Sequence, residues 1–419
     1  MSYSEDTIDF LHQGDLIGMQ NSLAKALKND NSEMLADLAE YLQMMGFIDE
    51  SQKIYDQIMS EDPETTDYLI NLAEIAEDNG NLDESLNYLY QIPVNDENYI
   101  AALVKIADLY QFEGDFETAI SKLEEARELS DSPLITFALA ESYFEQGDYS
   151  AAITEYAKLS ERKILHETKI SIYQRIGDSY AQLGNFENAI SFLEKSLEFD
   201  EKPETLYKIA LLYGETHNET RAIANFKRLE KMDVEFLNYE LAYAQTLEAN
   251  QEFEAALEMA KKRGKKKKPN AVPLLHFASK ISFKLKDKAA AERYLMDALN
   301  LPELHDETVF LLANLYFKEE DFEAVINLEE LLEDEHLLAK WLFAGAHKAL
   351  ENDSEAAALY EELIQTNLSE NPEFLEDYID FLKEIGQISK TEPIIEQYLE
   401  LVPDDENMRN LLTDLKNNY

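Results

Sequence analysis

The chain has 419 residues, of which 86 are acidic and 37 are basic, so its formal net charge is −49. It contains no cysteine, which excludes disulfides, thiolate metal sites and cysteine nucleophiles. So acidic a surface repels nucleic acid and anionic lipid, while the hydrophobic content of 45% is ordinary for a folded protein.

The amino-terminal segment MSYSEDTIDFLHQGD has neither a basic start nor an apolar run, so we expect no signal peptide. No stretch approaches the roughly 18 apolar residues that a membrane-spanning helix needs. We therefore expect a cytoplasmic protein without a transmembrane segment.

One spacing of small and large residues recurs along the chain. Gly177 is followed after three, nine, twelve and sixteen residues by Tyr180, Phe186, Ala189 and Leu193. Similar offsets follow other small residues, the anchors of a repeat of about 34 residues. The anchors are Ala39, Ala73, Ala107, Ala140, Gly177, Ala210, Ala244, Ala278, Ala313 and Ala344.

The repeat around Ala107 indicates why this spacing arises. Ile106, Ala107 and Tyr110 fall on one face of an amphipathic helix. Gly114 can end that helix in the left-handed conformation, and Asp115 can cap the next one. Because the break is short, the two helices must lie antiparallel, and the small anchors let their backbones approach closely.

A single hairpin of this kind cannot bury its own apolar faces, so neighbouring hairpins must stack into a continuous core. Two weaker copies, at 14–27 and around Ile379, bring the total to about twelve units and leave no length for a separate catalytic domain. The sequence predicts one continuous array over 1–419, with an atypical first repeat at 1–30, eleven repeats at 31–403 and a capping segment at 404–419.

These patterns resemble the tetratricopeptide repeat (TPR) family over nearly the whole chain. The segments GDYSAAITEY at 147–156 and GNFENAISFL at 184–193 match the family pattern closely. The family's early tryptophan is replaced by Leu35, Leu69, Leu103 and Tyr173, and its closing proline is in register only at Pro63, Pro302 and Pro403.

The chain looks like the long acidic TPR proteins of Gram-positive bacteria. This resemblance implies an all-α fold, an α-solenoid in which about twelve TPR helix hairpins form a right-handed superhelix.

The sequence lacks the residue patterns of catalytic and cofactor sites. No two of the seven histidines lie within one helical turn, and neither GxGxxG nor GxxxxGK[ST] occurs. We predict no catalytic residue, no metal and no cofactor, and therefore a protein that is not an enzyme.

A basic run, KKRGKKKKPN, interrupts the acidic chain at 261–270. Its density of like charge favours an exposed loop that offsets nearby acidity, and a contact for RNA, membrane phosphate or an acidic protein is the alternative. The residues in question are Lys261, Lys262, Arg263, Lys265, Lys266, Lys267 and Lys268.

The TPR resemblance implies a concave groove lined by the first helix of each repeat, three residues before the anchor and one and four after it. This register predicts an acidic early wall and a more aromatic late one, with Leu275 and Lys348 among the late positions. The candidate partner-binding residues are Glu74, Asp108, Phe137, Phe144, Tyr207, Phe310, Asn314, Phe317 and Trp341.

Trp341 is the only tryptophan, and it either lines this groove or packs between repeats. The sequence favours a non-enzymatic protein–protein interaction scaffold that binds a peptide segment or partner protein with basic and apolar residues. The alternative is a factor that associates with RNA or a membrane surface through Lys261–Lys268.

Overall fold

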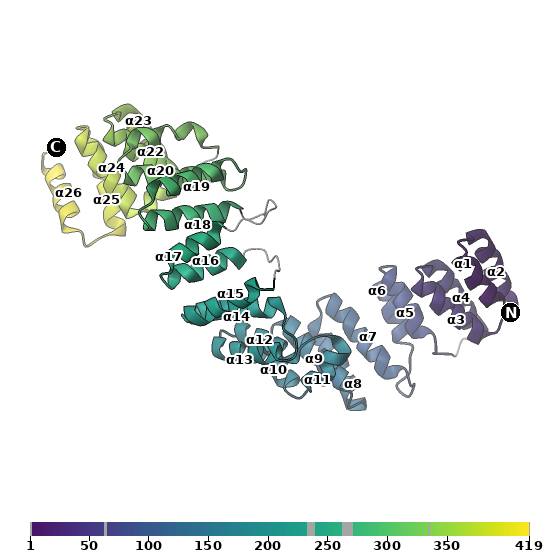
Figure 1. Ribbon diagram of the computed structural model, residues 1–419. Helices are drawn as coiled ribbons and strands as arrows, with labels where there is room; N and C mark the ends of the chain where they lie inside the picture. Colours follow the sequence, from purple (N-terminus) through teal and green to yellow (C-terminus); the bar gives the residue numbers. More distant parts are fainter. Residues whose placement is uncertain (1, 63–64, 233–238, 262–270, 334–335, 419) are drawn as a thin grey trace. The chain divides into compact units, whose positions relative to one another are not determined.

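A computed structural model describes residues 2–62, 65–232, 239–261, 271–333 and 336–418, and all regular secondary structure in these ranges is helical (Figure 1). The predicted all-α class is confirmed. The chain divides into two compact units, with the boundary between Thr205 and Leu206.

The first unit contains helices α1 to α13. They are α1 (Tyr3–His12), α2 (Leu16–Asn29), α3 (Ser32–Met44), α4 (Ile48–Glu61), α5 (Leu69–Asp78), α6 (Leu82–Leu89), α7 (Tyr99–Phe112), α8 (Phe116–Leu129), α9 (Pro133–Gln146), α10 (Tyr149–Tyr156), α11 (Glu161–Thr168), α12 (Ile172–Gln182) and α13 (Phe186–Leu197).

The second unit contains most of α14 and every later helix. They are α14 (Pro203–Glu215), α15 (Glu219–Glu230), α16 (Tyr239–Ala249), α17 (Phe253–Lys261), α18 (Ala271–Lys284), α19 (Lys288–Leu299), α20 (His305–Lys318), α21 (Phe322–Ile326), α22 (Leu337–Ala349), α23 (Asp353–Leu363), α24 (Pro372–Glu384), α25 (Thr391–Leu401) and α26 (Glu406–Asn418). Three short 3-10 helices lie at Glu329–Leu331, Asn367–Glu370 and Ile388–Lys390.

Consecutive helices joined by short turns form twelve pairs in the described residues, and only α11 and α26 fall outside this pairing. The prediction of an α-solenoid of about twelve helix hairpins is therefore confirmed. The subdivision at residues 30 and 403 stays a prediction.

The hairpin of α7 and α8 has the local features expected from its sequence. Ile106 and Ala107 are buried on the inner face of α7. Gly114 has a φ of +83°, which a residue with a side chain rarely adopts. The side chain of Asp115 accepts the backbone N–H of Thr118 at 3.1 Å, so it caps α8 as predicted.

The anchor Gly177 shows why a small residue is needed where paired helices touch. A Cβ atom at this position would lie 2.7 Å from Cγ of Leu193 and 3.1 Å from the carbonyl oxygen of Ala189. Both neighbours belong to α13 and are fully buried. The α12–α13 contact is thus closer than any side chain at residue 177 allows.

Two departures from the regular repeat have local causes. The longer interval between Ala140 and Gly177 holds the extra helix α11, whose Glu161 accepts the backbone N–H of Tyr173 at 3.0 Å near the start of α12. In the repeat of Ala313, the second helix α21 is only five residues long.

The early end of α21 is explained by the residue sixteen positions after the anchor Ala313. Most repeats have an apolar or aromatic residue at this position. Here the residue is Glu329, and its carboxylate meets the ring of His347 at 2.8 Å instead of entering the core.

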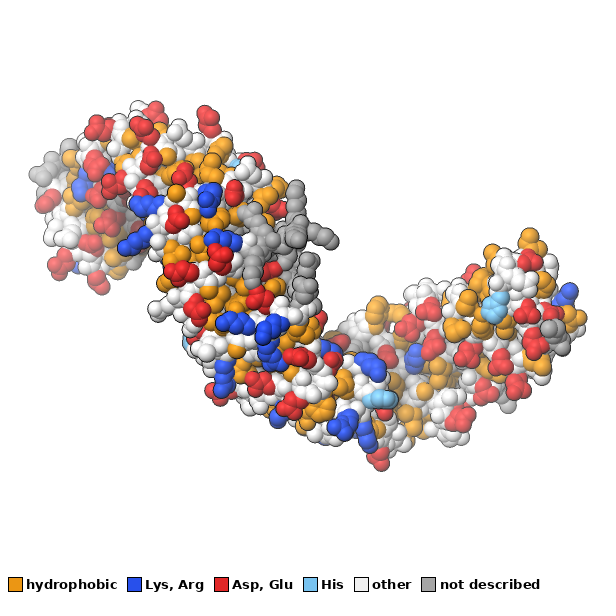
Figure 2. Space-filling model, in the orientation of Figure 1, with side chains coloured by type: hydrophobic (Ala, Val, Ile, Leu, Met, Phe, Trp, Pro, Cys, Tyr) orange, Lys and Arg blue, Asp and Glu red, His pale blue; other side chains and the backbone are white. Residues whose placement is uncertain are grey.

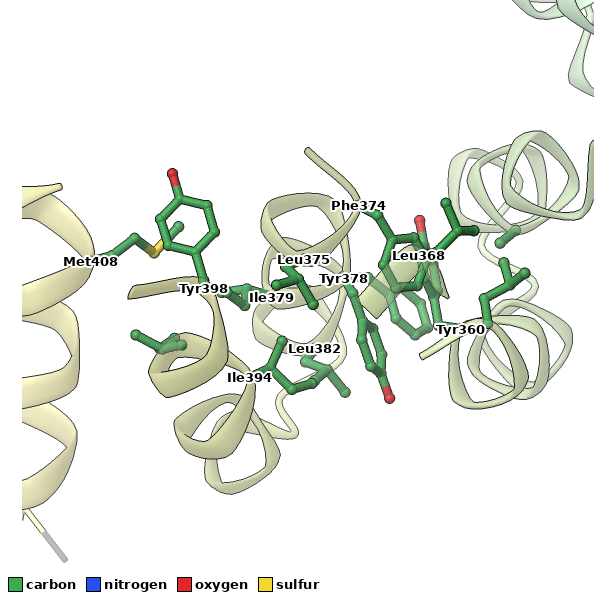
Figure 3. Close-up of a cluster of buried hydrophobic side chains, with 14 of the residues drawn as sticks. Tyr360, Leu368, Phe374, Leu375, Tyr378, Ile379, Leu382, Ile394, Tyr398 and Met408 are labelled. Atoms are coloured by element: carbon green, nitrogen blue, oxygen red, sulfur yellow. The ribbon is translucent and has the colours of Figure 1, made fainter. Parts of the chain in front are cut away.

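The core is a series of local clusters, as expected for stacked repeats. The cluster around α24 combines Tyr360, Phe374 and Tyr378 with Ile379 and Leu382 (Figure 3). Outside such clusters, acidic side chains are spread over the visible face of each unit (Figure 2). The high negative charge is thus carried at the surface, where water solvates it.

Candidate functional site

A hollow rich in aromatic side chains lies on α20, α22 and α24, the first helices of three successive repeats in the second unit, and Phe322 of α21 completes its lining. Its volume is about 650 Å³. It is lined by Phe310, Asn314, Phe317, Phe322, Leu338, Trp341, Leu342, Gly345, Lys348, Ala349, Asp377 and Glu384. We call this the aromatic hollow.

Trp341 is held in the wall of the aromatic hollow by contacts behind it. Its ring meets the buried ring of Phe374 edge-on, with centroids 5.6 Å apart and planes at 85°. Its indole N–H donates to the Asp377 carboxylate at 2.8 Å. Trp341 therefore lines the hollow and also packs against the next repeat. The two arrangements that the sequence left open as alternatives are both present.

Asp377 is the polar centre behind this wall. Besides the indole, its carboxylate accepts the hydroxyl of Tyr360 at 2.6 Å and the ammonium of Lys348 at 3.1 Å. Burial, followed by the charge of Asp377, raises the pKa of Tyr360, so this hydroxyl stays a proton donor at neutral pH. Figure 3 shows Tyr360 and Phe374 in the buried cluster that supports the wall.

The three other aromatic residues of the lining, Phe310, Phe317 and Phe322, also make ring contacts. The ring of Phe310 stacks on that of His336, with centroids 4.9 Å apart and planes at 20°. The ring of Phe317 meets Phe322 edge-on at 5.3 Å. A Cβ atom at Gly345 would lie 3.1 Å from the Phe317 ring, so the missing side chain keeps part of the hollow open.

The charged groups lie at the α22–α24 end of the aromatic hollow. Lys348 is 3.1 Å from the carboxylate of Asp377 and 3.9 Å from that of Glu384. The Glu384 side chain is 60% exposed, so it is the carboxylate with room for a further cation. Two acids against one lysine leave this end negative.

A second, smaller hollow of about 220 Å³ adjoins the first, and both include Asn314. It lies on α18, α19 and α20, and we call it the lysine hollow. Its lining residues are His276, Ser279, Lys280, Phe283, Lys284, Leu295, Leu311, Asn314, Leu315 and Lys318.

The lysines of this second hollow are only partly neutralised. Lys280 and Lys284 share one carboxylate, that of Glu248 on α16, at 2.8 and 2.7 Å. Lys318 has no carboxylate partner among the described residues, and its ammonium lies 5.9 Å from the centroid of the Phe283 ring. Burial lowers the pKa of His276 despite the nearby charge of Glu307, so the imidazole is neutral at pH 7.

The family models that match this chain describe helical repeats. Two are described as YpiA-like, one for tetratricopeptide repeats at residues 111–164 and one for carboxy-terminal tetratricopeptide repeats at 338–405. A general tetratricopeptide repeat model matches 170–203, and the ARM repeat of tetratricopeptide repeat protein 21 matches 13–113.

A protein of Bacillus subtilis strain 168, described as TPR repeat-containing protein YpiA, is 26% identical over 307 residues, which cover 72% of each chain. The chain is a tetratricopeptide repeat protein. It is similar to the TPR proteins of Gram-positive bacteria, as its sequence predicted.

Solved structures also align with parts of this chain. A tetratricopeptide repeat protein from Parabacteroides merdae is 19% identical and aligns with 59% of this chain and 97% of its own, with a TM-score of 0.38. Yeast Tom70 is 14% identical and aligns with 99% of this chain and 94% of its own, with a TM-score of 0.37.

TPR arrays generally present extended surfaces for protein partners. In this TPR protein the structure brings the predicted residues Phe310, Asn314, Phe317 and Trp341 together in the aromatic hollow, with Lys348 beside them. Their role as partner contacts stays a prediction.

The predicted residues of the first TPR unit lie apart from any hollow described above. Phe137 is 8% exposed and belongs to the core between α9 and α12. The Phe144 ring is covered by the guanidinium of Arg175 at 4.9 Å. Glu74 forms an ion pair with Lys105 at 2.6 Å, and Asp108 is exposed on α7.

Two further predicted positions lie in the second unit. Tyr207 is half-buried in α14, with its ring 6.2 Å from that of Phe226. Lys261 ends α17 and pairs with Glu258 at 2.7 Å, while the rest of the basic run, Lys262–Lys268, lies outside the described residues.

The sequence missed the lysine hollow because its register was wrong by one residue on α18. Leu275, the expected wall residue, is 2% exposed and packs in the core, while its neighbour His276 lines the hollow. One residue rotates the exposed face of a helix by about 100°. Anchoring this repeat at the buried Ser279, 34 residues before Ala313, would have predicted His276, Lys280 and Phe283 correctly.

Within the described residues, no helix combines the length and apolar character that crossing a bilayer requires. The same residues contain no group of three or more His, Asp or Glu side chains arranged to hold a metal ion.

Proposed function

We propose that this TPR protein is a non-enzymatic cytoplasmic scaffold, and that it binds a peptide segment or partner protein through the first helices of its repeats. The observation that supports this most strongly is the aromatic hollow, in which Phe310, Phe317 and Trp341 from two adjacent repeats surround an open volume of about 650 Å³. Tryptophan and other aromatic residues in such hollows are frequent anchors of protein recognition.

The chemistry of the hollow favours a ligand with an apolar side chain and a nearby cation. The three aromatic rings offer an apolar surface, and they are held rigidly by His336, Phe322 and Phe374. A preformed aromatic site loses little conformational entropy when a ligand enters. The exposed carboxylate of Glu384 then supplies a partner for a lysine or arginine of the ligand.

Acidic residues of the first unit favour the same class of partner. Glu74 and Asp108 occupy predicted wall positions there, and an acidic wall attracts basic segments. We propose that these residues bind basic segments of a partner on the first unit.

Filling the hollow provides a cleaner test than emptying it. Removing an aromatic side chain would weaken the packing behind the wall, whereas Gly345→Leu places an aliphatic side chain in the hollow and favours the α22 helix. Gly214→Leu is the matched control, because no atom lies within 4 Å of a Cβ at that helical position.

The probe is a library of phage-displayed random 12-residue peptides, selected on the full chain. We expect enriched peptides to combine an aromatic or aliphatic residue with lysine or arginine, and to shift the fluorescence of Trp341, the only tryptophan. Gly345→Leu should weaken their binding at least about tenfold, which corresponds to about 1.4 kcal/mol. Selected peptides that bind the Gly345→Leu and Gly214→Leu variants equally well would contradict the proposal.

A further inference from the structure

We propose that the lysine hollow is a subsite for an acidic side chain of the same ligand. The two hollows together would then bind a peptide that carries an acidic, an apolar and a basic residue in that order. This inference rests on the proposed function of the aromatic hollow and adds the ligand's charge pattern to it. It follows from the opposite charge of the two ends of one continuous surface on α18, α20, α22 and α24.

The positive end has a surplus of cations. Lys280, Lys284 and Lys318 face the lysine hollow, and Glu248 is the carboxylate that pairs with the first two. The ammonium of Lys318 contacts an aromatic ring and has no carboxylate partner among the described residues. The chain has a net charge of −49, so a positively charged hollow has the opposite sign to most of the surface. Such a hollow favours an anionic group of the ligand.

Of the uncharged groups of the lysine hollow, the Asn314 amide can donate to a carboxylate, whereas the neutral His276 ring uses its one N–H in the bond to Thr308. His276 is neutral at pH 7, and its Nε2 lies 2.7 Å from the hydroxyl of Thr308, which itself donates to the carbonyl of Leu304 at 2.8 Å. The amide of Asn314, shared by both hollows, can donate to an acidic side chain on one side or to the peptide backbone on the other.

The negative end lies beyond the aromatic rings, where Asp377 and Glu384 outnumber Lys348. Asp377 already accepts three hydrogen bonds, so Glu384 is the group that meets a ligand cation. The surface between α18 and α24 therefore changes from positive through apolar to negative.

The spacing of the ligand follows from the packing of the first helices. Helices α20 and α22 contact each other directly, and packed helices lie about 8–10 Å apart. An extended peptide advances about 3.3 Å per residue. About three residues should therefore separate the acidic, apolar and basic positions of the ligand.

The experiment uses synthetic nine-residue peptides carrying fluorescein, titrated with the full chain and followed by fluorescence anisotropy. The parent peptide has two glutamates, two spacers, a phenylalanine, two spacers and two lysines. A second peptide replaces the glutamates by lysines, and a third replaces the phenylalanine by serine.

We expect the parent peptide to bind most tightly and the all-lysine peptide to bind about fivefold more weakly, the upper range for one exposed charge pair. Lys318→Glu should reverse this preference, whereas Lys286→Glu, which makes the same charge change outside both hollows, should leave it in place. Glu248→Gln, which removes the carboxylate between two lysines, should strengthen binding of the parent peptide.

Equal binding of the parent and all-lysine peptides, unchanged by Lys318→Glu, would overturn the acidic subsite while leaving the aromatic hollow intact. Loss of preference for phenylalanine over serine, together with no effect of Gly345→Leu, would instead overturn the proposed function. No binding of any peptide at 1 mM chain would overturn both.

Discussion

Gly177→Ala tests the close packing on which the repeat depends. The new methyl group would lie 2.7 Å from Cγ of Leu193 and 3.1 Å from the carbonyl oxygen of Ala189. Leu193 is 0% exposed, so its side chain has no free space to enter. Overpacking of this kind costs about 1–3 kcal/mol, while alanine gains about 1 kcal/mol of helix propensity over glycine. We expect a net loss of about 1 kcal/mol in the stability of the α12–α13 hairpin, since the overpacking cost is the larger of the two.

Gly214→Ala provides the matched control, because it makes the same change in helix α14 where no atom lies within 4 Å of the new methyl group. Only the difference in helix propensity acts at this position, so the variant should gain up to about 1 kcal/mol in the stability of α14. The two substitutions are chemically identical and are expected to have opposite signs.

Amide hydrogen exchange followed by mass spectrometry measures both effects in the intact chain, since it reports the opening of each hairpin separately. A change of about 1 kcal/mol alters the opening equilibrium about fivefold. Protection of α12 and α13 should fall in Gly177→Ala, and protection of α14 should rise in Gly214→Ala. Increased protection in both variants would refute the close contact between α12 and α13.

Three further substitutions test local features of the two units. Asp148→Ala removes the side-chain cap of α10 and should lower protection of that helix by about 1 kcal/mol in the same exchange experiment; an unchanged helix would exclude the cap as a source of stability. Arg175→Ala removes the guanidinium that lies 2.5 Å from the mostly buried carboxylate of Glu141. Thermal melts should show the first unit destabilised by about 1.5–3 kcal/mol. An unaltered melt would be inconsistent with a stabilising ion pair. Burial raises the pKa of Glu248, but hydrogen bonds from two lysines outweigh it and lower the pKa overall. Its contribution to stability is therefore present above the unfolded-state pKa of about 4.3 and is lost as the pH falls through the lower folded-state value. Urea unfolding should accordingly find Glu248→Gln less stable than the parent at pH 7, with a difference that shrinks as the pH falls below about 4.3. A difference that stays constant on acidification would exclude the ion pairs as the cause.

The fold could be predicted from the sequence because each repeated residue has a direct physical consequence. A glycine such as Gly114 ends a helix, Asp115 begins the next, and Gly177 permits the contact between them. The extra helix α11 and the short α21 were visible only as an irregular interval and as one misplaced acid, Glu329. Neither signal states which structure replaces the regular one.

The candidate site was partly predictable for a similar reason. Phe310, Phe317 and Trp341 fall at repeat positions whose register the anchors fix correctly, so the structure brings them together. The lysine hollow depends on a register that differs by one residue on α18, and Asp377 lies on α24, where no small anchor marks the repeat. The lysines of the lysine hollow and the acidic partners of Lys348 could therefore not be predicted from the sequence.

A structure of the full chain with a selected peptide would test recognition through the aromatic hollow at the level of atoms. We predict that an apolar side chain of the peptide lies within about 4.5 Å of Phe310, Phe317 and Trp341, the distance of ordinary apolar contact. A peptide bound on another face, with this hollow open and its three rings unmoved, would contradict the account.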